Sequence, residues 1–159
     1  MKSPAVLHLL IALVWVFLSA ETTLGSFFVA LIATFLLLAL FQKAIGCQDY
    51  VRRVLAFIVF CGVFIREVIA SNLRIMLLAL TPDAGRRRGC YIDYNIEGLT
   101  EFEVLLISQC IGLSPGTMVS EPSADGRYLV IHAFPSATAK EVQTNLDEHL
   151  KNRILAFTR

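Results

Sequence analysis

Just past the middle of the chain, the sequence reads Leu106-Ile-Ser-Gln-Cys-Ile-Gly-Leu-Ser-Pro-Gly-Thr117. An apolar helix is expected to run up to Ile111, where Gly112 can take the positive φ with which helices commonly end. Pro115 lacks the N–H that would continue a helix, and Pro115-Gly116 is a turn dipeptide that can lead into a strand. We therefore interpret Gly112, Pro115 and Gly116 as a structural turn between a helix and a strand.

The composition separates a membrane half from a small folded domain. Of the 159 residues, 56% are hydrophobic and only 17% are charged, whereas soluble domains carry about 25% charged residues. The deficit is concentrated in residues 1–42, where Lys2 and Glu21 are the charged residues. We predict a membrane domain over residues 1–81 and a cytoplasmic α+β domain over residues 89–159. The net charge of +1 gives no indication of a nucleic-acid partner.

Two apolar runs near the amino terminus predict a transmembrane helical hairpin. Helices are expected at about residues 4–20 and 24–42, because a bilayer core needs roughly 17–25 apolar residues per helix. A signal peptide is the alternative for the first run, but the second run follows so closely that a retained helix is favoured. By the positive-inside rule both ends of the hairpin are cytoplasmic, on the evidence of Lys2, Lys43, Arg52 and Arg53.

His8 is the titratable side chain within the first apolar run. A histidine inside a membrane helix can belong to a proton relay. Near the end of a helix it can equally be an interfacial group, and this second interpretation is the simpler one.

The third apolar segment, at about residues 52–80, is either an amphipathic or a membrane-embedded helix. Its charge-free part, Val54 to Ile65, is too short to cross a bilayer alone. A full span would also export three arginines at residues 86–88, against the positive-inside rule, so we favour a helix at the cytoplasmic interface or one that enters only partway. The alternatives for its polar residues are a solvated stripe, or a partner interface or polar route formed by Arg66, Glu67, Asn72 and Arg74.

The segment after Gly89 predicts a small domain with the order β-α-β-β-α. Alternating residues from Tyr91 to Ile96 predict a half-buried strand, and Thr100 with Glu103 forms a capping box that starts a helix at about Glu101. The body of this helix is apolar on nearly all sides, which predicts burial on more than one face.

The rest of the domain predicts a hairpin and a final helix. Strands are expected over residues 117–120 and 128–133, on either side of the Asp125-Gly126 turn signal. A second capping box, Thr138 with Glu141, is expected to open the last helix. One apolar stripe should face the sheet, formed by Val142, Leu146, Leu150 and Ile154.

No motif in the sequence predicts catalysis, a cofactor or a metal. Phosphate-binding, dinucleotide-binding, metalloprotease and nucleophile-elbow patterns are all missing from the sequence. The four cysteines lack metal-ligand spacing and are interpreted as small apolar residues. A membrane-anchored enzyme that uses His132 with Asp93 or Asp125 is the weakest alternative, and we predict that the chain is not an enzyme.

Taken in order, these segments resemble a known family, the E subunits of the Mrp-type multisubunit monovalent cation/proton antiporters of bacteria. The resemblance lies in Glu67-Val-Ile-Ala-Ser-Asn-Leu-Arg-Ile75 followed by Pro82, and in the 106–117 stretch followed by an Asp-Gly hairpin and Tyr128-Leu-Val-Ile-His-Ala133. It covers nearly the whole chain. The family often has threonine where this chain has Gly112 or Ser114, which leaves the turn argument unchanged.

The resemblance implies an accessory and structural subunit of a complex that exchanges Na⁺, or K⁺, for H⁺ in the bacterial cell membrane. Its partners would be the lipid bilayer and the other subunits, of which the large ones carry the ion-conducting machinery. From the residues alone, a self-sufficient small oligomeric transporter or channel is the alternative, with Glu67 and His8 carrying protons.

Overall fold

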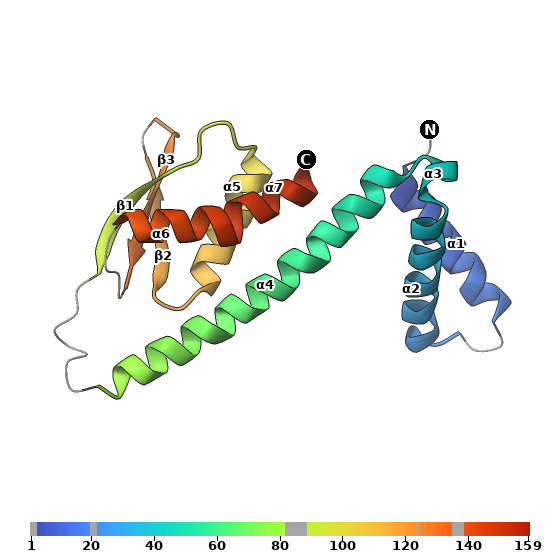
Figure 1. Ribbon diagram of the computed structural model, residues 1–159, viewed down its shortest axis with the longest axis horizontal. Coiled ribbons are helices and arrows are strands. Elements are labelled where there is room, and N and C mark those ends of the chain that lie inside the picture. The colour runs from blue at the N-terminus through green and yellow to red at the C-terminus, as the bar shows by residue number, and fades with distance from the viewer. Residues whose placement is uncertain (1–2, 20–21, 82–88, 124, 135–138) are drawn as a thin grey trace. The chain divides into compact units, whose positions relative to one another are not determined.

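Apolar helices form the first part of the structure, and a three-stranded sheet with its covering helices forms the last part (Figure 1). The structure is a computed structural model that describes residues 3–19, 22–81, 89–123, 125–134 and 139–159. It divides into two compact units, Met1–Leu55 and Ala56–Arg159, which are treated separately below. The sequence-based division into a membrane domain and a cytoplasmic domain concerns the bilayer and stays a prediction.

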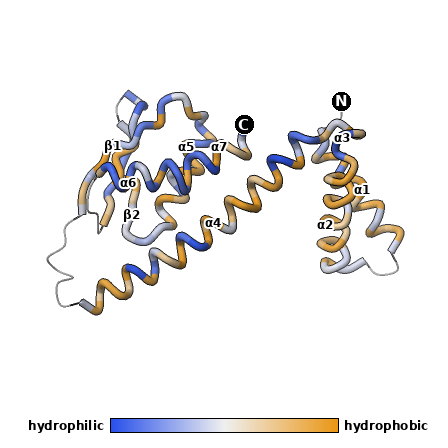
Figure 2. Tube along the Cα trace, viewed as in Figure 1, coloured by the Kyte–Doolittle hydropathy of each residue, from blue (hydrophilic) through white to orange (hydrophobic). Residues whose placement is uncertain are grey.

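The first unit contains α1 (Pro4–Leu18), α2 (Leu24–Leu40), α3 (Gln42–Ile45) and the beginning of α4 (Gln48–Ala79). Pro4 occupies the first turn of α1, where its missing N–H has no cost. Both α1 and α2 are apolar along most of their length (Figure 2). With 15 and 17 residues, they are about 22 and 26 Å long at 1.5 Å per residue.

The helix α4 is much longer than the other two. It has 32 residues and is therefore about 48 Å long. Among the described residues it is the one helix that is long and apolar enough, by length and composition, to cross a membrane. The sequence analysis expected the hairpin to cross and this segment to lie at the interface, and both expectations stay predictions.

The second unit is built on an antiparallel sheet of β1 (Cys90–Asn95), β2 (Thr117–Pro122) and β3 (Tyr128–Ala133), in the order β1-β3-β2. The expected alternation is present, since side chains that point to the core alternate with exposed ones. A bulge between Val119 and Glu121 interrupts the β2–β3 pairing. The core side chains of this sheet are Ile92, Tyr94, Leu129, Ile131 and Ala133.

The helix α5 (Glu101–Leu113) begins with the capping box that the sequence predicts. Its buried face, which includes Ile107 and Ile111, belongs to the core of the unit. The opposite face is not buried, because Phe102, Leu105 and Leu113 are 61%, 58% and 62% exposed. The elements of this unit that pack on α5 cover one side of it, so the expected burial of a second side stays a prediction.

The end of α5 differs from the expectation at Gly112. The helix continues through Gly112 to Leu113 and stops at Ser114, which has extended backbone angles. Proline disfavours helical angles in the residue before it, so Pro115 ends the helix at Ser114 without a left-handed glycine. The positive φ falls instead at Gly116, where a Cβ would collide with the carbonyl oxygen of Phe134.

The last helical segment has three parts, α6 (Ala139–Leu146), a π-turn η2 (Asp147–Lys151) and α7 (Asn152–Thr158). Thr138, half of the second predicted capping box, lies outside the described residues. Of the predicted apolar stripe, Leu150 and Ile154 are buried in the core and Leu146 packs against it, whereas Val142 lines a cavity beside α4. A spacing of four drifts around a helix of 3.6 residues per turn, and the wider i→i+5 turn offsets part of that drift.

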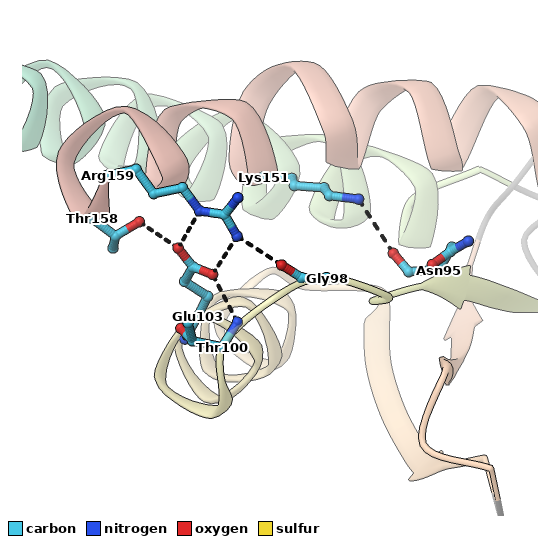
Figure 3. Close-up of polar contacts among 7 residues, drawn as sticks. All are labelled: Asn95, Gly98, Thr100, Glu103, Lys151, Thr158 and Arg159. Atoms are coloured by element: carbon cyan, nitrogen blue, oxygen red, sulfur yellow. Dashed lines mark hydrogen bonds and ion pairs between the residues drawn. The ribbon is translucent and has the colours of Figure 1, made fainter.

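A buried carboxylate joins α7 to the start of α5 (Figure 3). Glu103 is 2% exposed and accepts hydrogen bonds from Thr100 N (2.8 Å), Thr158 Oγ1 (2.7 Å), Arg159 Nε (3.1 Å) and Arg159 Nη2 (3.0 Å). The same guanidinium donates to Gly98 O at 2.8 Å. The hydrogen bonds from Arg159 are the main reason that the pKa of Glu103 falls to about 2.

Candidate functional site: a mixed cavity beside α4

Within the second unit, α4 has two different faces. Positions three and four residues apart share a face of a helix, and the outward stripe at this spacing is apolar and 50–76% exposed, formed by Ile58, Ile65, Ile69, Leu73, Met76 and Leu80. The inward face carries Phe60 and Phe64, and one or two turns later Glu67, Ser71 and Arg74. The exposed face of this part of α4 is therefore apolar, whereas its inward face carries both apolar and polar side chains.

Aromatic packing fixes the inward face of α4 against α7. Phe60 stacks on Phe64 with ring centroids 5.8 Å apart, and its ring centroid lies 5.3 Å from that of Phe157. Phe57 meets Phe157 edge to face, also with centroids 5.3 Å apart. Such pairs contribute roughly 0.5–1.5 kcal/mol each beyond simple burial, so this part of α4 is held firmly in the unit.

Next to this cluster the inward face of α4 borders a cavity of about 170 Å³. The face of α6 and η2 forms the opposite wall, and the Ser114-Pro115 turn with the end of β3 closes one side. The apolar lining consists mainly of Phe64, Ile75, Phe134, Val142 and Leu146. The side chains that bring charge or amide groups are Glu67, Arg74, Asn145 and His149.

The hydroxyl groups around the cavity donate hydrogen bonds to backbone carbonyl oxygens. Ser71 Oγ donates to Glu67 O at 2.7 Å, Thr117 Oγ1 to Ile111 O at 2.8 Å, and Ser114 Oγ to Cys110 O at 3.1 Å. These groups therefore shape the wall and do not offer their protons to a ligand.

Two nitrogen groups in the cavity remain available. No hydrogen bond or ion pair joins Arg74 to another residue in the described ranges, whereas the Glu67 carboxylate already accepts from Arg66 at 2.8 Å. His149 Nδ1 is buried and has no hydrogen-bond partner among the described atoms. Buried polar atoms are normally satisfied, so this nitrogen is able to form a hydrogen bond with a ligand in the cavity.

The structure brings together only part of the predicted set Arg66, Glu67, Asn72 and Arg74. Glu67 and Arg74 line the cavity. The Arg66 side chain is 72% exposed and reaches the cavity only through its ion pair with Glu67. Asn72 is exposed and donates to the backbone of Val68 at 2.8 Å.

The sequence analysis missed Asn145 and His149, which complete the cavity from the other end of the chain. Each lies one position before a member of the apolar stripe, Leu146 and Leu150, so the two form a parallel polar stripe. That spacing is visible in the sequence. Its meeting with Glu67 and Arg74 depends on how the domain packs against α4, which the sequence does not reveal.

Of the residues in the enzyme alternative, Asp93 and His132 are diagonal neighbours on one face of the sheet, and no hydrogen bond joins them among the described residues. In the sheet His132 lies opposite Tyr91 and Met118, while Asp93 lies opposite Val130. Asp125 stays in the hairpin turn, where it accepts from Ser123 Oγ at 2.6 Å and Arg127 N at 3.2 Å.

The buried cysteine of α5 is also unsuited to nucleophilic catalysis. The Cys110 thiol is in the core, and burial raises its pKa to about 11. At neutral pH it is a thiol and not the thiolate that nucleophilic chemistry needs.

In the first unit, His8 joins three helical segments. Its Nδ1 is 2.7 Å from Tyr50 Oη and its Nε2 is 2.9 Å from Leu31 O. Since a carbonyl can only accept, Nε2 donates to Leu31, and Nδ1 shares a hydrogen bond with the Tyr50 hydroxyl. Both ring nitrogens of His8 are thus used to hold α1 to α2 and to the start of α4.

Exposed apolar helices together with a small α+β domain are typical of a membrane protein. Comparison with known proteins gives the particular family. A family described as "Na+/H+ ion antiporter subunit" matches residues 8–157, and the chain belongs to this family.

Curated relatives agree with the family match. The chain is 28% identical over 153 residues to the Na(+)/H(+) antiporter E subunit of Bacillus subtilis and 25% identical over 153 residues to that of Alkalihalophilus pseudofirmus, covering 96% of both chains in each case. It is 27% identical over 146 residues to the E1 subunit of Staphylococcus epidermidis, covering 92% of this chain and 91% of the relative. The resemblance found in the sequence is confirmed.

Proposed function

We propose that this chain is an accessory and structural subunit of a multisubunit Na⁺(K⁺)/H⁺ antiporter in the bacterial cell membrane. It would support assembly and cation/proton exchange through contacts with the other subunits, and the ion path would lie in those subunits. Membership of an antiporter subunit family over residues 8–157 is the observation that carries the proposal.

The exposed apolar surface supports a role in assembly. Besides the helices of the first unit, α5 of the second unit exposes Phe102, Leu105 and Leu113 along one side. A large exposed apolar patch on a folded domain is typical of a contact with another protein or with a membrane. We propose that another subunit covers this side of α5.

We also propose that the chain is a multi-pass protein with its α+β domain in the cytoplasm. The basic residues that flank the hairpin support cytoplasmic ends. The two faces of α4 support a helix at the membrane surface beyond Ile58, with its apolar stripe toward lipid and its inward face on the domain.

The test is affinity purification of the tagged full chain from its native membrane in mild detergent, followed by mass spectrometry. We expect several hydrophobic chains to co-purify, including the large antiporter subunits. Leu105→Glu places a charge on the exposed side of α5 and should reduce their recovery. Thr144→Glu adds the same charge to an exposed position of α6 and is the matched control.

Full recovery of the partners with Leu105→Glu would refute the proposed contact at α5. Recovery of the wild-type chain alone, together with ion flux from that purified chain, would replace the subunit proposal with the self-sufficient transporter.

A further inference from the structure

We infer that the cavity beside α4 binds the phosphate group of an anionic phospholipid. The inference rests on the proposed function only in placing α4 at a membrane surface. It goes further in assigning a ligand to the space among Arg74, Asn145 and His149.

The charges around the cavity favour an anion. Arg74 forms no ion pair or hydrogen bond among the described residues, and the Glu67 carboxylate, which also feels the charge of Arg74, has its direct ion pair with Arg66 at 2.8 Å. Two arginines therefore face one carboxylate here. Arg74 therefore leaves a positive charge at the cavity. Buried His149 Nδ1 and the Asn145 amide can each donate to a phosphate oxygen.

The apolar lining favours a lipid over a soluble anion. Phe64, Ile75, Phe134 and Val142 would gain nothing from a small hydrated ion, but they match the carbon atoms next to a lipid phosphate. The outward stripe of α4, which includes Ile69 and Leu73, is exposed on the other side of the same helix turns. Acyl chains that leave the cavity would reach the bilayer beside this stripe.

The size of the cavity fits a head group and not a whole lipid. Its 170 Å³ is close to the roughly 150 Å³ of an engineered protein cavity that holds benzene. A phosphate group with the first carbon atoms of its glycerol has a comparable number of heavy atoms. A zwitterionic head group fits less well, because its ammonium group would approach Arg74 while Glu67 is already paired with Arg66.

The experiment measures lipid binding to the full chain in the complex in which it is purified. Native mass spectrometry would follow titration with phosphatidylglycerol, with phosphatidylethanolamine and with inorganic phosphate. We expect phosphatidylglycerol to bind and Arg74→Gln to weaken its binding about tenfold, as for the loss of one charge-assisted hydrogen bond. His149→Gln should weaken it less. Arg127→Gln, which removes an exposed arginine from the hairpin, should leave it unchanged.

Unchanged phosphatidylglycerol binding by Arg74→Gln would overturn the inference. Equal binding of inorganic phosphate would overturn it as well, because the site would then recognise a free anion. If Arg74→Gln loses a partner subunit but keeps its bound phosphatidylglycerol, the cavity would bind a carboxylate of that partner. This outcome would also overturn the inference.

Failure of the inference can be told apart from failure of the proposed function. If the partner subunits co-purify and phosphatidylglycerol binding is the same in Arg74→Gln as in the wild-type chain, only the lipid site is refuted. A chain recovered alone that still binds phosphatidylglycerol through Arg74 would refute only the subunit role. Equal yields and equal circular dichroism of Arg74→Gln and Arg127→Gln establish that both variants fold.

Discussion

His8 and Glu103 are polar side chains that hold helices together, one in each unit, and they are satisfied in different ways. His8 has one hydrogen bond at each ring nitrogen, to a hydroxyl and to a carbonyl. Glu103 is an ionised carboxylate that accepts four hydrogen bonds, two of them from one guanidinium (Figure 3).

The difference follows from the cost of removing a charge from water. A neutral polar group needs only its ordinary hydrogen bonds when it leaves water, whereas a carboxylate also needs a counter-charge. In the first unit, the hydrogen-bond partners of His8 are a hydroxyl and a carbonyl, neither of which brings a counter-charge. The domain can use a charge because Arg159 is half exposed and brings its counter-charge from the surface.

The largest expected effect comes from Glu103→Ala. The change leaves Thr100 N–H without its acceptor and removes the anchor of Thr158 and Arg159, so we expect α7 to loosen from α5. The free energy of unfolding should fall by about 2–3 kcal/mol. Hydrogen exchange of α5 and α7 peptides in the full chain measures it, and unchanged protection in both helices would contradict the role given to Glu103.

Acid should reproduce part of that loss in the wild-type chain. The pKa of Glu103 is about 2 in the folded chain against an ordinary value of 4.5, so the unfolded chain takes up the proton first. The stabilisation is complete above the ordinary value and disappears as the pH falls from about 5 to 2, by about 2 kcal/mol because Arg159 keeps part of its hydration. Glu103→Gln has no carboxyl to titrate and should lack this part of the pH dependence of hydrogen exchange.

A smaller effect is expected from His8→Phe, which keeps a ring but removes both hydrogen bonds. Tyr50 Oη and Leu31 O lose their partner, and we expect the first unit to lose about 1–2 kcal/mol. Hydrogen exchange of α1 and α2 peptides measures it, and Leu9→Phe, at an exposed position of α1, is the control. Equal exchange in the two variants would mean that the His8 bonds contribute nothing to stability.

The smallest effect is expected from Asp49→Asn. This residue forms an exposed ion pair with Arg52 at 3.6 Å, with side chains 88% and 59% exposed. Exposed pairs contribute roughly 0–1 kcal/mol, so we expect exchange in the first turn of α4 to change less than in His8→Phe. A larger change in Asp49→Asn would contradict the view that burial gives a polar contact its importance.

The elements predictable from sequence were those with local signals. The Thr100–Glu103 capping box fixed the start of α5, and the apolar alternation with the Asp-Gly signal fixed β1 and β3. The prediction of a positive φ at Gly112 was wrong, although a glycine near a helix end commonly forms a left-handed cap. The restriction that Pro115 places on Ser114 ended the helix instead.

Contacts between distant residues could not be predicted in this way. Glu103 was recognised as a cap, but its bonds to Arg159 join residues 56 positions apart. His8 and Tyr50 are 42 positions apart. Likewise, Glu67 and Arg74 were singled out on α4, but the cavity needed His149 from the other end of the domain.

The π-turn at Asp147–Lys151 sets the angular phase of everything that follows it. If the same residues formed a regular α-helix, the segment after this turn would be rotated by about 100° around the helix axis. Ile154 would then leave the core, Phe157 would leave the rings of α4, and Arg159 would point away from Glu103. Deleting one residue from the turn removes the extra residue together with the wide turn and keeps this phase, so it should be tolerated far better than a one-residue deletion elsewhere in the segment.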